Sequence, residues 1–203
     1  MGRQEPGGIV GAIVRARLGV ATVAAAYLLG VLAGAIMAHT GNRFALSYRD
    51  RMVSQAIKTS PILHADGSGK PLVAAALDTA GNAAGGIGGV ISGYCLPIGY
   101  AIAVYRGWIG GIVSVDWRHR SRLAIDNGAA YYVTVMLLQL IPFSLTGGAG
   151  INIGLAAFTT LTPYKRTKWS YPPRRAVLDA AILFAVSLPI FAIASTVEFL
   201  WKS

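Results

Sequence analysis

Charged and amide side chains within otherwise apolar segments are the residues of this chain that could carry chemistry. Such side chains are costly to bury, and they usually face the protein interior or a binding partner. They are Asp78, Asn82, Arg106, Gln139, Asn152, Asp179 and Glu198. We take four of them as the candidate polar core: Asp78, Asn82, Arg106 and Gln139.

Asp78 and Arg106 carry opposite charges and predict an ion pair. Asp78 lies near the start of one apolar segment and Arg106 near the end of the next. A hairpin of two helices would therefore bring them to a similar depth. Asn82 follows Asp78 by one helical turn, on the same face. Two alternatives stay open: Arg106 could extend to a membrane interface, or these groups could relay protons.

Asp179 and Glu198 have simpler interpretations. Asp179 follows Arg174 and Arg175 by about one helical turn, which predicts a local salt bridge. Glu198 lies near the end of the last apolar segment, and we assign it no special role.

Catalytic and metal-binding motifs are missing from the sequence. His39, His64 and His119 lack metal-ligand spacing, although we expect all three on the same side of the molecule. We find no Gly-x-Ser-x-Gly, no Walker loop and no paired carboxylates. The single cysteine, Cys95, lies in an apolar stretch and predicts a packed thiol. The expectation is a protein without enzymatic activity, cofactor or metal.

The composition indicates an integral membrane protein. Hydrophobic residues make up 54% of the 203 residues and charged residues only 13%, whereas soluble domains are roughly 25% charged. The net charge of +10 would suggest nucleic acid in a soluble protein. Here the basic residues lie outside the apolar segments, which favours contact with anionic lipid headgroups and control of topology.

The apolar segments predict an all-α transmembrane bundle with about five spans. A polar segment at 1–17 precedes a single membrane domain at 18–203. The predicted spans are residues 18–38, 72–94, 98–115, 129–162 and 176–200. The stretch 72–115 would reach about 65 Å as one helix, twice the bilayer core, so it must fold back near Pro97.

The fourth span is too long for a simple crossing and has two breaking signals. Pro142 and the glycines at 147–150 predict a kinked or re-entrant segment near 142–162, with a sixth helix as the alternative.

The run 18–38 could instead be a signal peptide, but 21 uncharged residues exceed the usual apolar region of roughly 7–15. Residues 47–58 predict an amphipathic helix at the interface, and 64–71 a linker. Tryptophans at predicted helix ends suit interfacial anchors: they are Trp117, Trp169 and Trp201.

Glycines recur at four-residue spacing. Residues four apart share a helix face, and a face without side chains lets two backbones approach closely in lipid. This predicts helix packing, with a conduction path along the grooves as the alternative. The candidate packing residues are Gly81, Gly85, Gly89, Gly93, Gly107, Gly111, Gly150 and Gly154, and the pair Gly30 and Gly34 repeats the spacing.

The order of motifs in residues 72–154 resembles the stage II sporulation protein M family of multi-spanning membrane proteins. The motifs are Gly86-Ile-Gly-Gly89, Arg106-Gly-Trp-Ile-Gly-Gly111, Leu137-Leu-Gln-Leu-Ile-Pro142 and Thr146-Gly-Gly-Ala-Gly150-Ile-Asn-Ile-Gly154. The family often has Glu at the position of Gln139, and Asn-Gly at Arg106-Gly107. In endospore formers it resembles a scaffold for peptidoglycan-remodelling enzymes, which implies assembly without intrinsic catalysis.

The sequence therefore predicts a non-catalytic scaffold or accessory subunit of a membrane complex. The alternative is a small transporter or channel component, with a polar path along the candidate core and Asn152. We expect a multi-pass protein of the inner (plasma) membrane with its amino terminus in the cytoplasm. Expected partners are other integral membrane proteins and lipids with anionic headgroups, with no nucleic acid. A homo-oligomer would also suit the chain.

Overall fold

The computed structural model describes residues 8–124, 126–159, 164 and 170–201. This part of the chain is all-α, as predicted. Its helices are α1 (Gly8–His39), α2 (Arg43–Thr59), α3 (Pro61–Gly67), α4 (Pro71–Gly93), α5 (Leu96–Ile112), α6 (Asp126–Phe158) and α7 (Arg174–Leu200), with a short 3-10 turn at Arg122–Ala124.

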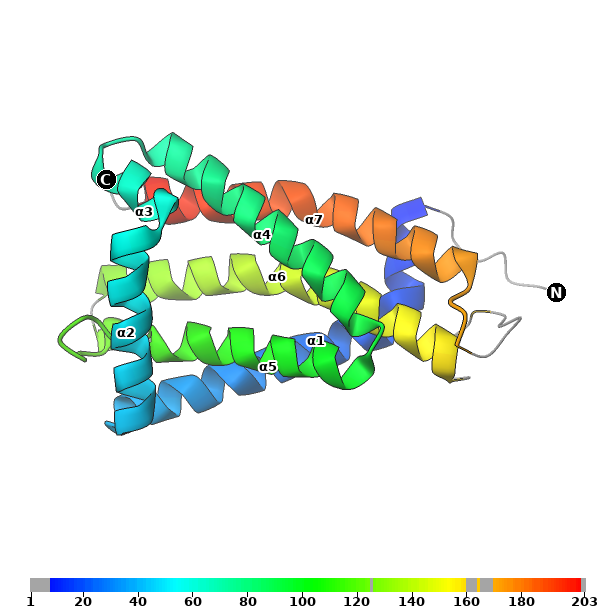
Figure 1. The fold of residues 1–203 in the computed structure, drawn as a ribbon, viewed down its shortest axis with the longest axis horizontal. Helices are drawn as coiled ribbons and strands as arrows, with labels where there is room; N and C mark the ends of the chain where they lie inside the picture. Colours follow the sequence, from blue (N-terminus) through cyan, green and yellow to red (C-terminus); the bar gives the residue numbers. More distant parts are fainter. Residues whose placement is uncertain (1–7, 125, 160–163, 165–169, 202–203) are drawn as a thin grey trace.

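The long helices form one bundle around α6. Helices α1, α4, α5, α6 and α7 all run between the same two ends of the molecule, and α2 lies across one of them (Figure 1). We call this the α2 end, which also holds α3 and the loop at 113–121. The opposite end holds the turn between α4 and α5 and the start of α7. Helix α5 packs chiefly on α1, whereas α4 packs on α6 and α7.

Three helices are long and apolar enough to cross a membrane: α1, the part Gly128–Phe158 of α6, and α7. This supports a membrane protein but is fewer than the five expected spans. Helix α5 has 17 residues, about 25 Å, which is shorter than the bilayer core. Helix α4 is long enough, but it is not among the three helices apolar enough to cross, and its sequence holds Asp78 and Asn82.

Helix α6 is continuous, so the expected re-entrant segment is wrong for residues 142–158. Pro142 lies inside the helix, where it removes one backbone donor. The Thr146 hydroxyl donates to the Pro142 carbonyl at 2.9 Å. The glycines at 147–150 do not break the helix, and the backbones of neighbouring helices pack closely on Gly148 and Gly150. A sixth helix does not form up to Phe158, and residues 160–162 lie outside the described part.

The expected polar segment at 1–17 ends earlier than the sequence suggested. Helix α1 begins at Gly8 and includes Arg15 and Arg17, and residues 1–7 lie outside the described residues. Arg15 is buried in a region where small side chains let α1, α6 and α7 approach closely. This core includes Ala12, Ala16, Ala149, Ala156, Ala176 and Ala180.

The amphipathic helix predicted at 47–58 is present within α2. The Asn42 side chain caps its start by accepting from the Ala45 amide at 3.1 Å. At this end Tyr48 contacts the Trp108 ring edge-on, with ring centroids 5.1 Å apart. The linker expected at 64–71 is partly helical, because α3 extends to Gly67. Trp117 and Trp201 are exposed beyond helix ends, and Trp169 lies outside the described residues.

Candidate functional site

Asp78 joins α4 to α7. Its Oδ2 accepts a hydrogen bond from the Ser195 hydroxyl at 2.7 Å and one from the Asn82 amide at 2.8 Å. The expected shared face of Asp78 and Asn82 is therefore correct. The sequence did not predict Ser195 as a partner of Asp78, because a serine in an apolar helix does not indicate which residue it will bond.

Arg106 does not pair with Asp78, so the predicted ion pair is wrong. Its guanidinium carbon lies 4.2 Å from the centre of the Phe143 ring and beside Gly85. Gly85 is seven residues beyond Asp78, about 10 Å along the helix. The reason is the packing of the hairpin: α4 and α5 meet near Gly93 and Gly99 and then diverge (Figure 1).

Gln139 contacts a different residue from those expected. Its amide donates to Glu198 Oε2 of α7 at 3.2 Å. The Tyr131 hydroxyl donates to the Glu198 backbone carbonyl at 3.0 Å. Glu198, to which the sequence assigned no role, therefore links α6 to α7. The candidate polar core is divided among separate helix contacts.

The opposite end of the bundle holds a buried network of hydrogen bonds that the sequence did not predict. Arg15 of α1 donates from Nε and Nη2 to the Asp179 carboxylate of α7, at 2.6 and 2.8 Å. The Tyr164 hydroxyl also donates to Asp179, and the Asn152 amide of α6 donates to the Tyr164 oxygen, both at 2.8 Å. The predicted contact from Arg175 to Asp179 exists at 3.6 Å, but it is the longer one.

Tyr164 remains a neutral donor in this network. Burial is the largest cause that raises the pKa of its phenol above the usual range, and the hydrogen bond to Asp179 adds to it. The sequence feature that could have indicated this network was Asp179, a carboxylate in an apolar helix. Its partner could not be read from sequence spacing, because Arg15 precedes it by 164 residues.

The glycine pairs of α1 and α5 pack against each other. A Cβ added to Gly107 would collide with the Tyr27 carbonyl oxygen, and one added to Gly111 with that of Val31. Reciprocally, Gly30 and Gly34 contact the carbonyls of Val104 and Trp108 on α5. The predicted packing role is correct here for Gly107 and Gly111.

A second glycine seam joins α4 and its following turn to α6. A Cβ on Gly150 would lie 2.5 Å from the Val90 carbonyl oxygen, and one on Gly154 would lie 2.7 Å from that of Tyr94. Gly93 contacts the backbone of Gly150, and Gly89 lies near Gly147. These four predicted packing residues therefore belong to one interface.

Gly81 and Gly85 do not belong to this seam. A Cβ on Gly81 would meet nothing within 4 Å, and one on Gly85 would meet only the Arg106 side chain. The cause is geometric: steps of four residues rotate by about 40° each around a helix of 3.6 residues per turn. From Gly81 to Gly93 the face turns by about 120°, so the stripe divides between two faces.

The histidines lie at the α2 end, as expected, but do not converge. His39 Nε2 bonds with the Ser121 hydroxyl at 2.8 Å, and His119 Nε2 with Asp50 Oδ2 of α2 at 2.9 Å. His64 lies apart on α3. Among the described residues, no three His, Cys, Asp or Glu side chains are grouped to hold a metal ion. Cys95 is exposed at the turn between α4 and α5, so the expectation of a packed thiol is wrong.

No protein-family model, curated protein or solved structure matches this chain. The resemblance to the stage II sporulation protein M family therefore stays a prediction.

Proposed function

We propose that the protein is a non-catalytic integral membrane scaffold or accessory subunit, which assembles or stabilises a membrane protein complex. The observation that carries this proposal is that polar side chains within the membrane bundle form hydrogen bonds between helices. Asp78 is bonded to Ser195 and Gln139 to Glu198, each pair joining two helices. Polar groups used this way hold a bundle together and leave its outer faces for partners.

The proposed topology has five crossings, formed by α1, α4, α5, α6 and α7. All five run between the same two ends (Figure 1). The low hydropathy of α4 fits this role because part of its glycine-rich surface faces α6 instead of lipid. We place the opposite end, with Arg15, Arg17, Arg174 and Arg175 beside helix starts, on the cytoplasmic side of the inner (plasma) membrane.

The proposed partners are other integral membrane proteins and anionic lipid headgroups. The resemblance to the stage II sporulation protein M family supports an assembly role. The amphipathic helix α2 adds a surface at one end of the bundle, with Arg43 and Lys58 near its ends, which suits contact with lipid headgroups.

The alternative is a small transporter or channel component. It requires one continuous path along the polar side chains. Asp78 and Gln139 instead contact α7 towards the α2 end, whereas Asn152 is bonded to Tyr164 at the opposite end. One observation favours this alternative: the Arg106 side chain is only half-buried.

The proposal is tested by isolating the tagged full chain from its native membranes in lipid nanodiscs, followed by mass spectrometry. We expect specific membrane proteins in fixed ratio to the chain, and none with an equally expressed, unrelated multi-pass protein as the control. Recovery of the chain alone as a monomer would contradict the scaffold function. The variants Asp78→Cys, Asn82→Cys and Gln139→Cys, each in a Cys95→Ser background, test the alternative: labelling of all three by a membrane-impermeant maleimide would favour a channel.

A further inference from the structure

Arg106 lies close to the middle of the bundle. Its neighbour Gly107 packs on the Tyr27 carbonyl, and Tyr27 is one residue from Leu28, the midpoint of the uncharged run 18–38. Phe143, under the guanidinium, is near the middle of α6. Arg106 is thus a cation at about half the depth of a bilayer spanned by α1 and α6.

The described part of the chain offers Arg106 neither a hydrogen-bond acceptor nor a carboxylate. Its contacts are the Phe143 ring at 4.2 Å, Gly85 and an electrostatic interaction with Tyr27. A guanidinium carries five N–H donors, and an aromatic face satisfies only part of its charge. Arg15, which is buried within α1, has the Asp179 carboxylate instead. Arg106 therefore requires an acceptor from outside this part of the chain.

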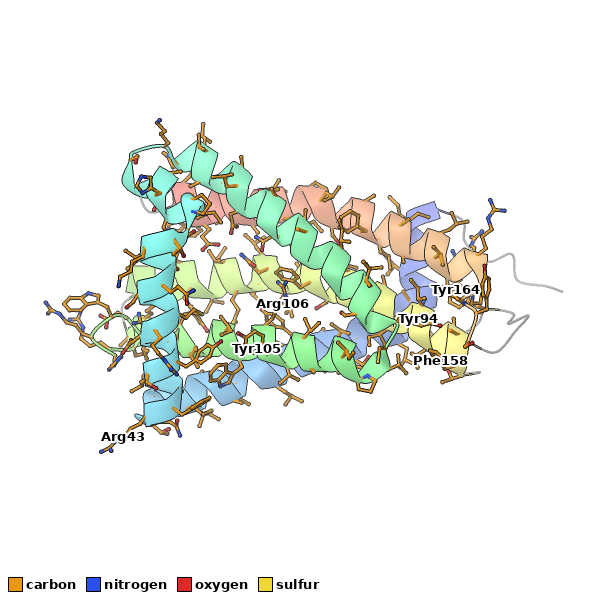
Figure 2. The ribbon with its side chains drawn as sticks, viewed as in Figure 1. Arg43, Tyr94, Tyr105, Arg106, Phe158 and Tyr164 are labelled. Carbon is orange, nitrogen blue, oxygen red and sulfur yellow. The ribbon has the colours of Figure 1, made fainter. Side chains whose placement is uncertain are left out.

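The α4 surface beside Arg106 is uncovered. Gly81, Gly85 and Gly88 share one face of the helix, and a Cβ added to Gly81 or Gly88 would meet nothing within 4 Å. Figure 2 shows Arg106 extending from α5 towards α4, in the space where the two helices diverge. A face of glycines allows a second helix backbone to come close.

We propose that Arg106 and this glycine face receive a transmembrane helix of another membrane protein, which carries Asp or Glu near its midpoint. This inference rests on the proposed scaffold function and names the chemistry of its partner. A carboxylate on such a helix would lie at the depth of Arg106, whereas a lipid phosphate lies about 15 Å away at the interface. A second copy fits less well, because Asp78, Asp179 and Glu198 already accept hydrogen bonds within their own chain.

The test uses the full chain in phosphatidylcholine vesicles, with a donor dye on its single cysteine, the exposed Cys95. The probe is a leucine–alanine helix of about 20 residues, enough to span the bilayer, with one Asp at its midpoint and an acceptor dye at one end. Matched probes carry Asn or Leu in place of Asp. Energy transfer as a function of probe concentration gives the affinity.

We expect the Asp probe to bind at least about tenfold more tightly than the Leu probe, since the carboxylate accepts charge-assisted hydrogen bonds from the guanidinium and leucine accepts none. Arg106→Leu should abolish this difference, and Arg106→Lys should retain part of it. Arg118→Leu is the matched control, because Arg118 lies over the Trp117 ring in the loop beyond α5. If Arg106→Leu fails to fold, Gly88→Leu provides the second variant, since it fills an open face and should block the probe.

Three results with the probes would overturn the inference, and so would one result with the native complex. Equal affinity of the Asp and Leu probes is one, and binding that survives both Arg106→Leu and Gly88→Leu is another. The third is loss of Asp-probe binding when phosphatidylglycerol is added to the vesicles, which would assign Arg106 to a lipid headgroup. A native complex unaffected by Arg106→Leu would also overturn this inference while leaving the scaffold function intact. Tight Asp-probe binding by a chain that purifies alone would support this site and contradict the scaffold function.

Discussion

Arg15 and Asp179 form a two-point salt bridge within the membrane bundle, although 164 residues separate them. Their side chains are 4% and 1% exposed, so both charges are removed from water. The bridge ties the start of α1 to the start of α7, and Tyr164 and Asn152 connect it to α6. Among the described residues, this network therefore connects all three helices at the opposite end of the bundle.

We predict that Asp179→Asn lowers the stability of the fold strongly. Removing one partner of a buried ion pair costs about 3 kcal/mol or more, because the remaining charge stays buried. Arg175→Met is the matched control: Arg175 is 56% exposed, and its loss should cost at most about 1 kcal/mol. The measurement is thermal unfolding of the full chain in one detergent.

The double variant Arg15→Met and Asp179→Leu separates the charge from the packing. Replacing a buried pair by apolar side chains of similar size is often neutral, so it should recover most of the lost stability. If Asp179→Asn unfolds like Arg175→Met, then the bridge does not stabilise the bundle.

A second prediction compares Gly107 with Gly81, which the four-residue glycine spacing marks equally as packing residues. Gly107→Ala should destabilise the protein by about 1–3 kcal/mol, since the added methyl group forces α1 and α5 apart at the Tyr27 carbonyl. Gly81→Ala should be neutral or stabilising, because the site is open and alanine favours helix by up to about 1 kcal/mol. Thermal midpoints of both variants in the same detergent test this. Equal effects would mean that the α1–α5 seam is looser than described.

The third prediction concerns pH and the loop beyond α5. The Asp116 carboxylate accepts backbone N–H bonds from Arg118 and Arg120, at 2.8 and 2.9 Å. The bond from the Arg120 backbone is the largest cause that lowers the pKa of Asp116 to about 2. Because the folded pKa lies below the unfolded value, the ionised carboxylate stabilises the loop above pH 3.8, and this is lost as the pH falls through about 2.

Nuclear magnetic resonance of the two arginine amides provides the measurement for this loop. Their proton shifts should change with a midpoint near pH 2, and Asp116→Asn should remove the transition. A midpoint at the ordinary value of 3.8 would show that the two amides do not bond the carboxylate.

Local features of the sequence were enough to predict the helical membrane class and much of the glycine packing. Apolar length and composition mark α1, α6 and α7 as candidate spans. The spacing of Gly107 and Gly111 marked a seam that packs against α1. These predictions succeeded because hydropathy and helical periodicity are properties of neighbouring residues.

The partners of the polar groups were decided only by the tertiary structure. Asp78 and Arg106 are neighbours in a sequence hairpin, yet α4 packs on α6 and α7 while α5 packs on α1, so their side chains reach Ser195 and Phe143 instead. Asp179 likewise bonds most closely with Arg15, which no spacing rule connects to it. The sequence by itself determined which residues are costly to bury. Helix packing over long sequence separations decided which contacts offset that cost, and within the described residues it left Arg106 without a carboxylate.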